Sequence, residues 1–349
     1  MDQQVLHDIV EKAARAPSIH NTQPWRFVAH DDLIELWTDP NRGLAVLDPT
    51  GRARHLSCGA ALLHARIAAE AAGYPADVVL APDGTQPEHL ADLRLASASS
   101  TGPHDLADAI SNRRTEREAF TPEPLNQDVV EALRRAAEAE GCWLRVVDSS
   151  DDETAVAVLL ARADALESED PSYREELRRW TGRGTDARDG VPPSAVPGTD
   201  PSRRGTNFRL RDFVADRDET GSDDGTDGAD SSEDPPAVER PLVALLGTRD
   251  DDVAAWLAAG QGLARLLLTA TSLGVAASPM TQPLEIPETR SRLATELGVL
   301  GHPQMLLRLG HANDDGLSPA PARTPRRTVQ DMLEVHDEDP LTGPGPPRR

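Results

Sequence analysis

The stretch Ala16–Phe27, APSIHNTQPWRF, turns the chain from a helix into a strand and carries more polar side chains than a corner needs. Apolar residues recur at helical spacing over 3–15, which predicts a helix that Pro17 ends. The residues that follow predict two paired strands, Arg26–Ala29 and Leu33–Thr38. A polar loop held between regular elements is typical of a binding site.

The rest of the chain predicts an α+β protein in which the same order of helices and strands occurs twice. The first unit continues with an Ala-rich helix over 53–72 and strands within 76–82 and 90–96. A helix over 125–141, a strand over 142–148, a long helix within 251–273 and a strand over 303–310 repeat that order. We therefore predict two tandem related halves, 1–105 and 106–335, packed as a pseudo-dimer around mostly antiparallel sheets. The alternative is that Ala-rich helices resemble one another by composition alone.

Residues 171–236 interrupt the second half. They begin with a helical pattern over 172–182 and end in the acidic run DRDETGSDDGTDGADSSEDPP, 216–236, which predicts a mobile segment. An insertion this long is either a functional lid or a disordered linker. Residues 336–349, rich in Pro and Gly, are predicted to be a disordered tail.

The composition limits the partners of the protein. A formal net charge of −23, with Lys12 as the only lysine, disfavours nucleic acid and anionic membranes. It suggests a protein adapted to high salt, or simply a high-GC genome; folding that is best at low salt would contradict the first.

Two widely separated cysteines predict neither a disulfide nor a metal site and agree with a reducing cytoplasm. We see no apolar run of membrane-span length.

A cluster of arginines occurs in Ser111–Phe120, SNRRTEREAF. Arg113 and Arg117 would share one face of a helix, and Arg114 and Thr115 add a second guanidinium and a hydroxyl. Such a set near a helix start could cradle a phosphate. The alternative is a solvated helix face that balances the many acids. Two polar segments could complete a site or be plain surface: SPMTQP, 278–283, and TPRRTV, 324–329.

Two of these motifs resemble those of one family. APSIHNTQPWRF resembles the APSxxNxQPWxF signature of nitroreductase-like flavoproteins, and RRTER resembles their RRSxR motif. The order of the two is reversed here, which resembles the single-chain, internally duplicated branch of the family. The resemblance covers about 3–170 and 237–330 and implies a nitroreductase-like fold. No P-loop, HExxH or GxSxG motif competes with it.

The resemblance implies FMN bound between the two halves. It assigns the phosphate to the arginines, the polar ring edge to the amides of the first motif, and part of the ring environment to the second half. The expected cofactor-binding residues are Ser18, Asn21, Gln23, Arg113, Arg114, Thr115, Arg117, Pro279, Met280, Gln282, Arg326 and Arg327. We expect no catalytic side chain, because flavin carries its own redox chemistry.

The implied activity is hydride transfer from NAD(P)H through flavin N5 to a nitroaromatic, quinone or similar electrophile. The alternative is a protein that binds or sequesters FMN under a lid and reduces little. Two loop residues stay open: His20 as a general acid or a hydrogen-bonded loop residue, and Trp25 as a core residue or a ring-stacking partner. We expect either a monomeric pseudo-dimer or a homodimer.

Overall fold

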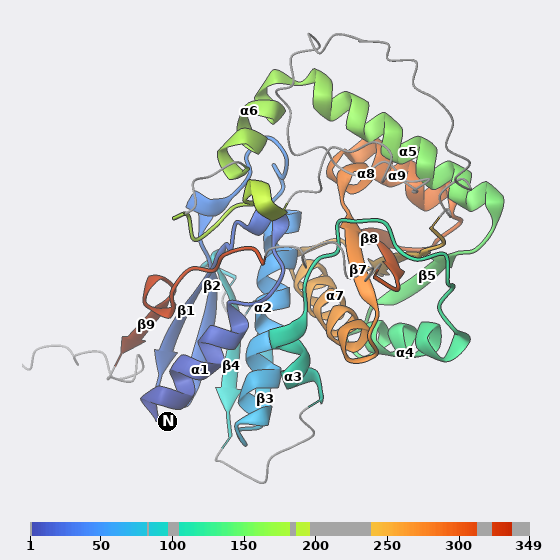
Figure 1. The fold of residues 1–349 in the computed structure, drawn as a ribbon. Coiled ribbons are helices and arrows are strands. Elements are labelled where there is room, and N and C mark those ends of the chain that lie inside the picture. Colours follow the sequence, from blue (N-terminus) through green and yellow to red (C-terminus); the bar gives the residue numbers. More distant parts are fainter. Residues whose placement is uncertain are drawn as a thin grey trace, which may run out of the picture.

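Two antiparallel-rich sheets lie on either side of a central helix pair in the computed structural model (Figure 1). The structure describes residues 2–81, 84–96, 105–181, 186–195, 239–312 and 323–336. The predicted tail beyond His336 and most of the predicted acidic insertion lie outside these ranges. The α+β class predicted from the sequence is confirmed.

The first sheet has the strand order β3-β4-β2-β1-β9, antiparallel except where β9 runs parallel to β1. Alternate residues of its strands pack against two helices, and Pro17 follows the first of these as expected. The elements are α1 (Gln3–Ala13), β1 (Trp25–His30), β2 (Leu33–Thr38), α2 (Arg52–Ala71), β3 (Ala76–Leu80), β4 (His89–Leu95) and β9 (Leu333–His336).

The second sheet has the strand order β5-β6-β8-β7 and is antiparallel throughout. Helices α4 and α7 cover one face, and α5, α8 and α9 cover the other. The elements are α4 (Gln127–Glu138), β5 (Trp143–Val147), α5 (Ser150–Glu169), β6 (Leu242–Thr248), α7 (Val253–Ser272), β7 (Ala276–Met280), α8 (Gln282–Glu285), α9 (Pro287–Glu296) and β8 (His302–Gly310). Both faces of this sheet are therefore buried.

The two sheets have the same topology. When β1 to β4 are matched with β5 to β8 in chain order, the strand neighbours of one sheet become those of the other. Even the irregularity recurs: β2 and β4 shift register after Leu36, and β6 and β8 shift register after Leu246. Helix α2 leads from the second strand to the third, as α7 does in the other sheet.

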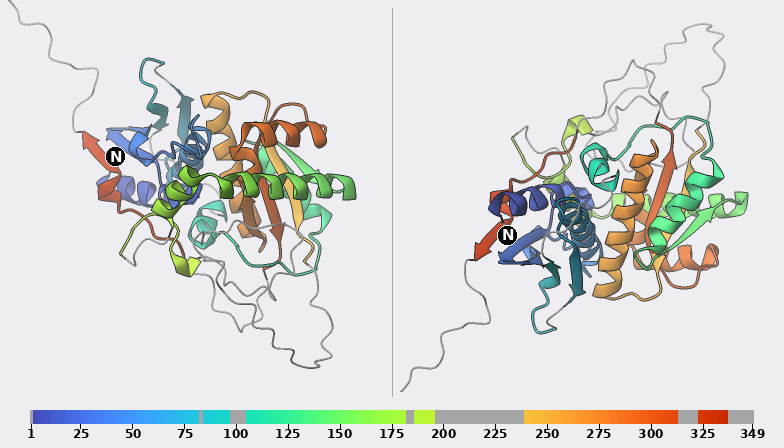
Figure 2. Two further views of the ribbon diagram at one scale, coloured as in Figure 1. Left: turned by 90° about the horizontal axis from the view of Figure 1, so that it is seen from above. Right: turned by 90° about the horizontal axis from the view of Figure 1, so that it is seen from below.

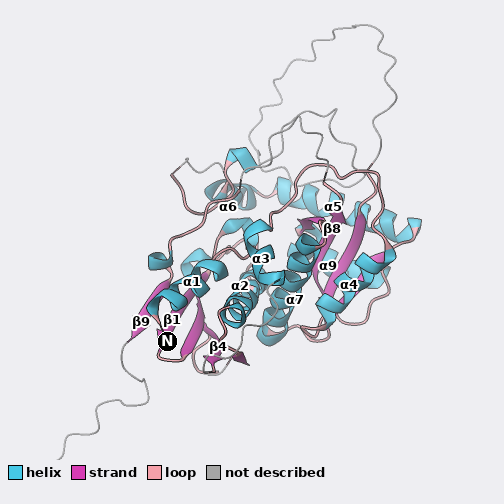
Figure 3. Cartoon of the chain, turned by 60° about the horizontal axis from the view of Figure 1, so that its bottom comes forward, coloured by secondary structure: helices cyan, strands magenta, loops and turns pink. Residues whose placement is uncertain are grey.

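Helices α2 and α7 pack side by side at the centre of the molecule (Figures 2 and 3). Each helix has a glycine at the point of closest contact, Gly59 in α2 and Gly260 in α7. A Cβ atom on Gly59 would lie 2.2 Å from the carbonyl oxygen of Leu257. A Cβ atom on Gly260 would lie 2.0 Å from the carbonyl oxygen of Leu56. Each glycine is the eighth residue of its 20-residue helix, so the contact is symmetrical. The absence of side chains at these two positions lets the halves meet backbone to backbone.

Replacing Gly59 with alanine is expected to lower the free energy of unfolding by about 1–3 kcal/mol, because the added methyl group must push two helix backbones apart. Gly260→Ala should cost a similar amount. Gly84→Ala is the matched control, since nothing lies within 4 Å of its Cβ position. Urea unfolding of the three variants measures the difference. Equal stability of Gly59→Ala and Gly84→Ala would show that the crossing can relax.

The structure corrects two expectations. Arg113–Arg117 are not on a helix: α3 (Asp105–Asn112) ends before them, and Thr115 and Glu116 pair instead with Ala277 beside β7. The unpaired backbone of that strand edge offers hydrogen bonds that a local helix would forgo. Residues 333–335, assigned to the second half, and His336, assigned to the disordered tail, form β9 and pair with β1 in the first sheet. The boundary at residue 105 stays a prediction.

The inserted segment begins as expected. Helix α6 (Pro171–Trp180) covers the predicted helical pattern, and its apolar side chains pack on the first half. Tyr173, Leu177 and Trp180 contact Leu44, Leu47 and Ile19.

One described helix, α7, has the length and mean hydropathy of a membrane span, contrary to our reading of the sequence. Within its span-like window 61% is buried inside the protein. The Gly260 crossing and the second sheet account for its apolar character, since both pack directly against it.

Candidate functional site

A cavity of about 240 Å³ lies between the two halves of the molecule. The first half contributes the polar loop Pro17–Asn21 and the first two turns of α2. The second half contributes the end of β7, the start of α8, Leu263 of α7 and Met305 of β8. Residues 110–117 and 323–326 complete the wall. Neither half alone could form it.

The cavity is strongly cationic although the protein is acidic. Among the described residues, seven arginines line it against a single acid, Glu285, which gives these residues a formal charge of +6 (seven minus one). Such a concentration of guanidinium groups favours an anionic ligand, and phosphate above others, because the planar donors match its oxygens. The arginines are Arg15, Arg52, Arg113, Arg114, Arg117, Arg323 and Arg326.

Arg113 and Arg326 are the best placed of these to hold an anion. Burial, and then the charge of Arg117, lowers the pKa of Arg113 to about 10. Burial, and then the charges of Arg113 and Arg15, lowers the pKa of Arg326 to about 9. Among the described ion pairs, none joins either guanidinium to a carboxylate, and the Nε of each has no hydrogen-bond partner. Two cations are thus held close together with no carboxylate partner among the described residues, although Arg326 donates to Asn21 and Thr324 and both arginines reach the carbonyl oxygen of Arg15.

His64 lies behind these arginines on α2 and is fully buried. Burial, and then the nearby Arg113, lowers its pKa to about 3, so its ring is neutral at physiological pH. Its Nδ1 lies 3.3 Å from the carbonyl oxygen of Lys12, while Nε2 has no partner. The region around Arg113, Arg326 and His64 therefore holds unmet hydrogen-bonding capacity as well as positive charge.

The polar loop is held in a strained shape. His20, Asn21 and Gln23 have positive φ values of 43°, 55° and 49°. Backbone strain of this kind costs about 1–3 kcal/mol per residue and clusters at functional sites. Ser18 helps to maintain the shape, because its hydroxyl accepts a hydrogen bond from the backbone of Gln23 at 3.0 Å. Both Ser18 and His20 line the cavity.

The two amides of the loop bind the protein itself. Asn21 donates to the carbonyl oxygens of Gly190 and Pro325 at 2.9 and 3.0 Å, and accepts from Arg326 at 2.9 Å. Gln23 donates to the carbonyl of Arg188 at 2.9 Å and accepts from the backbone of Arg327 at 2.9 Å. The loop therefore fastens two distant segments, 186–191 and 323–327, to the cavity.

Trp25 is a core residue, as the first of our two alternatives expected. Its side chain is fully buried, and its indole N–H lies 3.3 Å from the sulfur of Met332.

Most of the residues predicted from the sequence meet at this cavity. Ten of the twelve line it, from both halves of the chain. Gln23 and Arg327 do not line it; Arg327 binds the carbonyl oxygens of Gln23 and Trp25 instead. The ten are Ser18, Asn21, Arg113, Arg114, Thr115, Arg117, Pro279, Met280, Gln282 and Arg326.

Three of the arginines that line the cavity were not predicted from the sequence. Arg15 and Arg323 flank motifs that we had already singled out, so wider windows would have included them. Arg52 begins α2 and is buried, with its guanidinium bound to the carbonyl oxygens of Gln304 and Leu284. No local pattern marks it, because its partners lie more than 200 residues away.

Comparison with known proteins gives consistent relatives. A family model described as the nitroreductase family matches residues 207–311. The Mycobacterium tuberculosis protein Rv3131, provisionally named an NAD(P)H nitroreductase, is 36% identical over 342 residues, 97% of this chain and 93% of its own. The M. tuberculosis protein acg, with the same provisional name, is 36% identical over 96% of this chain and 97% of its own.

The solved structures that match are less similar to this chain in sequence than the relatives above. One is the FMN-dependent nitroreductase NfnB from Mycobacterium smegmatis in complex with NADPH. It is 19% identical, has a TM-score of 0.39, and covers 66% of this chain and 97% of its own.

Proposed function

Because this chain belongs to the nitroreductase family, we propose that it is an FMN-dependent oxidoreductase that takes hydride from NAD(P)H. The observation that carries the proposal is the cavity between the halves, where seven arginines face one acid. An excess of buried positive charge is costly, and a phosphate dianion is a ligand that would offset the cost.

The residues present fit FMN. Arg113 and Arg326, each with an unpartnered Nε, would hold the phosphate, and Arg117 and Thr115 lie in the same wall. Apolar side chains from both halves would bind the ring system: Ile19, Leu56, Leu263, Pro279, Met280 and Met305. Asn21 and Gln23, by contrast, already spend their amide donors on backbone carbonyls. Their proposed role is to shape the loop rather than to read the ring edge.

Bound FMN would supply the hydride chemistry, accepting from NAD(P)H and donating to an electrophile. The protein's contribution would be binding, orientation and exclusion of water. The apolar walls would exclude water from the ring, and the arginines would fix its position through the phosphate. We propose a nitroaromatic, a quinone or a similar electrophile as the acceptor. His20 stays a candidate proton donor.

One observation favours the second function, storage of FMN without efficient reduction of an acceptor. Val191 lines the cavity, and Asn21 and Gln23 bind the carbonyl oxygens of Gly190 and Arg188. The segment 186–191 thus forms part of the wall near α6 and could restrict a second substrate.

A visible spectrum followed by an anaerobic titration separates these functions. The purified protein should be yellow, and NADH or NADPH should bleach the flavin absorbance within seconds to minutes. Re-oxidation by a quinone or a nitroaromatic then supports the reductase. A yellow protein that neither nicotinamide bleaches supports storage. A colourless protein that takes up no added FMN contradicts both.

We infer that the two halves are tandem repeats that fold as a pseudo-dimer. The shared strand order, the matching register shifts and the symmetrical glycine crossing support this inference. A further dimer of this chain and a cytoplasmic location stay predictions.

A further inference from the structure

We propose that the first sheet carries a binding site for a divalent transition-metal ion such as Zn²⁺, formed by Glu35, His89 and Asp92. One ligand atom from each of these side chains lies within 4.8 Å of the other two. All three belong to the face of β2 and β4 that points away from α1 and α2. The proposal is independent of the flavin site, whose cavity contains none of these residues.

The backbone aims the three side chains at one another. Glu35 stands directly opposite Asp92 in the antiparallel pair of β2 and β4. His89 and Asp92, three residues apart, would point to opposite faces of a regular strand. The register shift between Leu36 and Trp37 pairs Trp37 with His89 and so returns the histidine to the face of Asp92. Strand residues also make a more rigid site than loop residues do.

Neighbouring groups orient two of the ligands. The His89 ring stacks on Trp37, with centroids 4.5 Å apart and planes 7° from parallel. The Trp37 indole donates to the Oε2 atom of Glu35 at 2.8 Å. Support of this kind is characteristic of metal sites, where partners outside the ligand set fix each ligand. His30, with its Nε2 3.8 Å from the Oε1 atom of Glu35, is placed to become a fourth ligand.

The facing carboxylates of Glu35 and Asp92 would be stabilised by a bound cation. Two carboxylates that face each other across a strand pair repel, which destabilises the sheet unless something compensates. Arg94 reaches Asp92 at 3.6 Å, but its side chain is 63% exposed and no ion pair joins it to Glu35 among the described residues. His89 Nε2 lies 2.9 Å from Asp92 Oδ1. A metal ion between the three would satisfy both carboxylates.

The other sheet shows that the fold does not require these residues. The matching positions of β6 and β8 hold Leu245 for Glu35, Leu306 for Asp92 and Pro303 for His89. Leu245 and Leu306 are buried beneath α5, α8 and α9. The polar set therefore belongs to the first sheet alone.

The geometry suits a small ion after modest closure. Zinc binds His nitrogen and carboxylate oxygen at about 2.0–2.2 Å, which puts tetrahedral ligands about 3.4 Å apart. At 2.9 Å the His89–Asp92 contact is about 0.5 Å shorter than this spacing. The ligand atom of Glu35 lies within 4.8 Å of the other two, so it would need to move by at most about 1.4 Å. One imidazole and two carboxylates, with a second imidazole nearby, favour Zn²⁺ and its transition-metal neighbours over Mg²⁺.

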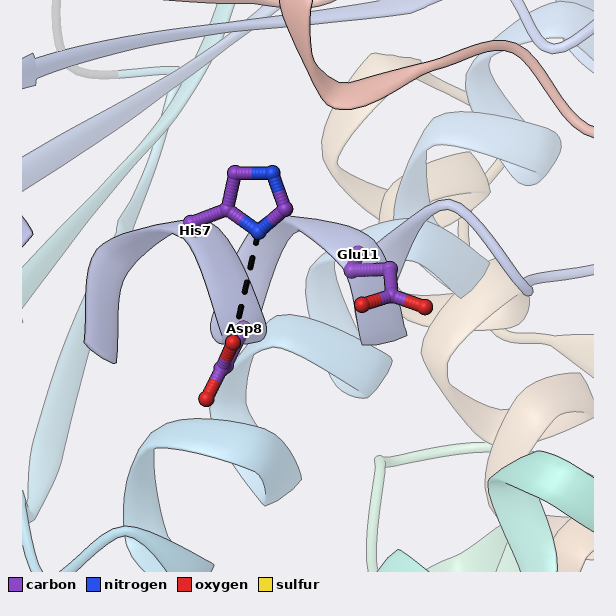
Figure 4. A group of neighbouring side chains, drawn as sticks. All are labelled: His7, Asp8 and Glu11. Carbon is purple, nitrogen blue, oxygen red and sulfur yellow. Dashed lines mark ion pairs between the residues drawn. The ribbon is translucent and has the colours of Figure 1, made fainter. Parts of the chain in front are cut away.

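A second group of the same residue types provides an internal control. His7, Asp8 and Glu11 lie on α1 (Figure 4), where His7 Nδ1 is 4.0 Å from Asp8 Oδ1. Asp8 and Glu11 are exposed and His7 is half-buried. Both carboxylates already have partners, because Gln4 donates to Asp8 at 2.7 Å and Arg15 pairs with Glu11 at 3.3 Å. We expect weak binding there at most.

The test is a Zn²⁺ titration of untagged, chelator-treated full-length protein by calorimetry, with excess Mg²⁺ and 1 M NaCl to suppress non-specific binding to surface acids. We expect one Zn²⁺ per chain, a rise in Tm, and, with Co²⁺ as a probe, visible absorption bands of a four-coordinate site. His89→Gln should weaken binding at least tenfold and abolish those bands.

Glu35→Gln, which keeps an acceptor for Trp37, should also weaken binding, and His7→Gln should leave it unchanged. The same values with and without FMN would separate this result from the fate of the flavin proposal. Absence of stoichiometric binding, or binding that His89→Gln and Glu35→Gln leave intact, would overturn the site.

Discussion

Replacing Glu239 with alanine should lower the free energy of unfolding by about 3–5 kcal/mol, the largest stability loss we expect from a single side chain. Glu239 is buried and its Oε1 accepts from Arg308 of β8 at 2.5 Å. Its other oxygen accepts from the backbone of Phe120 at 2.7 Å. Arg308 is completely buried and stacks over the Phe120 ring. Removing the carboxylate would take from a buried cation the acid that is hydrogen-bonded to it and leave only weaker compensation, such as the nearby charge of Glu116.

Two comparison variants separate the buried charge from simple loss of volume. Glu288→Ala breaks an ion pair with Arg162 in which both side chains are about half exposed, and it should cost less than about 1 kcal/mol. A double change, Glu239→Leu with Arg308→Met, removes both charges and should recover most of the loss. Urea unfolding of the apoprotein at a fixed salt concentration measures all three. A Glu239→Ala protein as stable as Glu288→Ala would show that water or another acid compensates Arg308.

The double substitution Arg113→Ala with Arg326→Ala should weaken FMN binding by about 10²–10⁴-fold. Each charged hydrogen bond to phosphate contributes about 1.5–3 kcal/mol, and the phosphate would lose at least one such bond for each arginine removed. Neither arginine has a carboxylate partner among the described residues, so their loss breaks no ion pair of the apoprotein. Arg326 does, however, donate to Asn21 and to the carbonyl oxygens of Arg15 and Ala16, so the Tm of the apoprotein should fall somewhat. Titration of apoprotein by FMN, followed by quenching of flavin fluorescence, gives the affinity.

Riboflavin, which lacks the phosphate, is the discriminating ligand for these variants. The wild type should prefer FMN strongly, and the double variant should bind the two flavins about equally. Arg327→Ala removes the same charge from the neighbouring position, outside the cavity, and should keep most of the preference for FMN. If the double variant loses riboflavin as readily as FMN, the substitutions have damaged the cavity and the phosphate assignment fails.

Local patterns in the sequence predicted the regular elements and most of the site, for a clear reason. Alternation along β1 and β2 and the apolar stripes of α1 and α2 are encoded within a few residues. Four short motifs marked ten cavity residues because each motif is contiguous in the sequence: the polar loop, the arginine cluster, 278–283 and 324–329.

The failures that matter most for the site were non-local. The spacing of Arg113 and Arg117 fits a helix, but the open edge of β7 binds that segment as extended chain. Asn21 and Gln23 have amides suited to a ligand, yet carbonyl groups from residues 188, 190 and 325 occupy them. Nothing near Leu333 in the sequence indicates that it pairs with Phe27. Such contacts depend on segments that lie 150 to 300 positions away.

The return of residues 333–336 to β1 has a consequence for synthesis on the ribosome. Both sheets could gain their main strands once residue 310 has left the exit tunnel. Arg326, Met332 against Trp25, and β9 against β1 arrive only with the last described residues. A nascent chain that ends near residue 310 would thus have both main sheets but would lack Arg326, one of the two arginines proposed to bind the phosphate. Capture of a ligand would then require that the chain has been translated at least through Arg326.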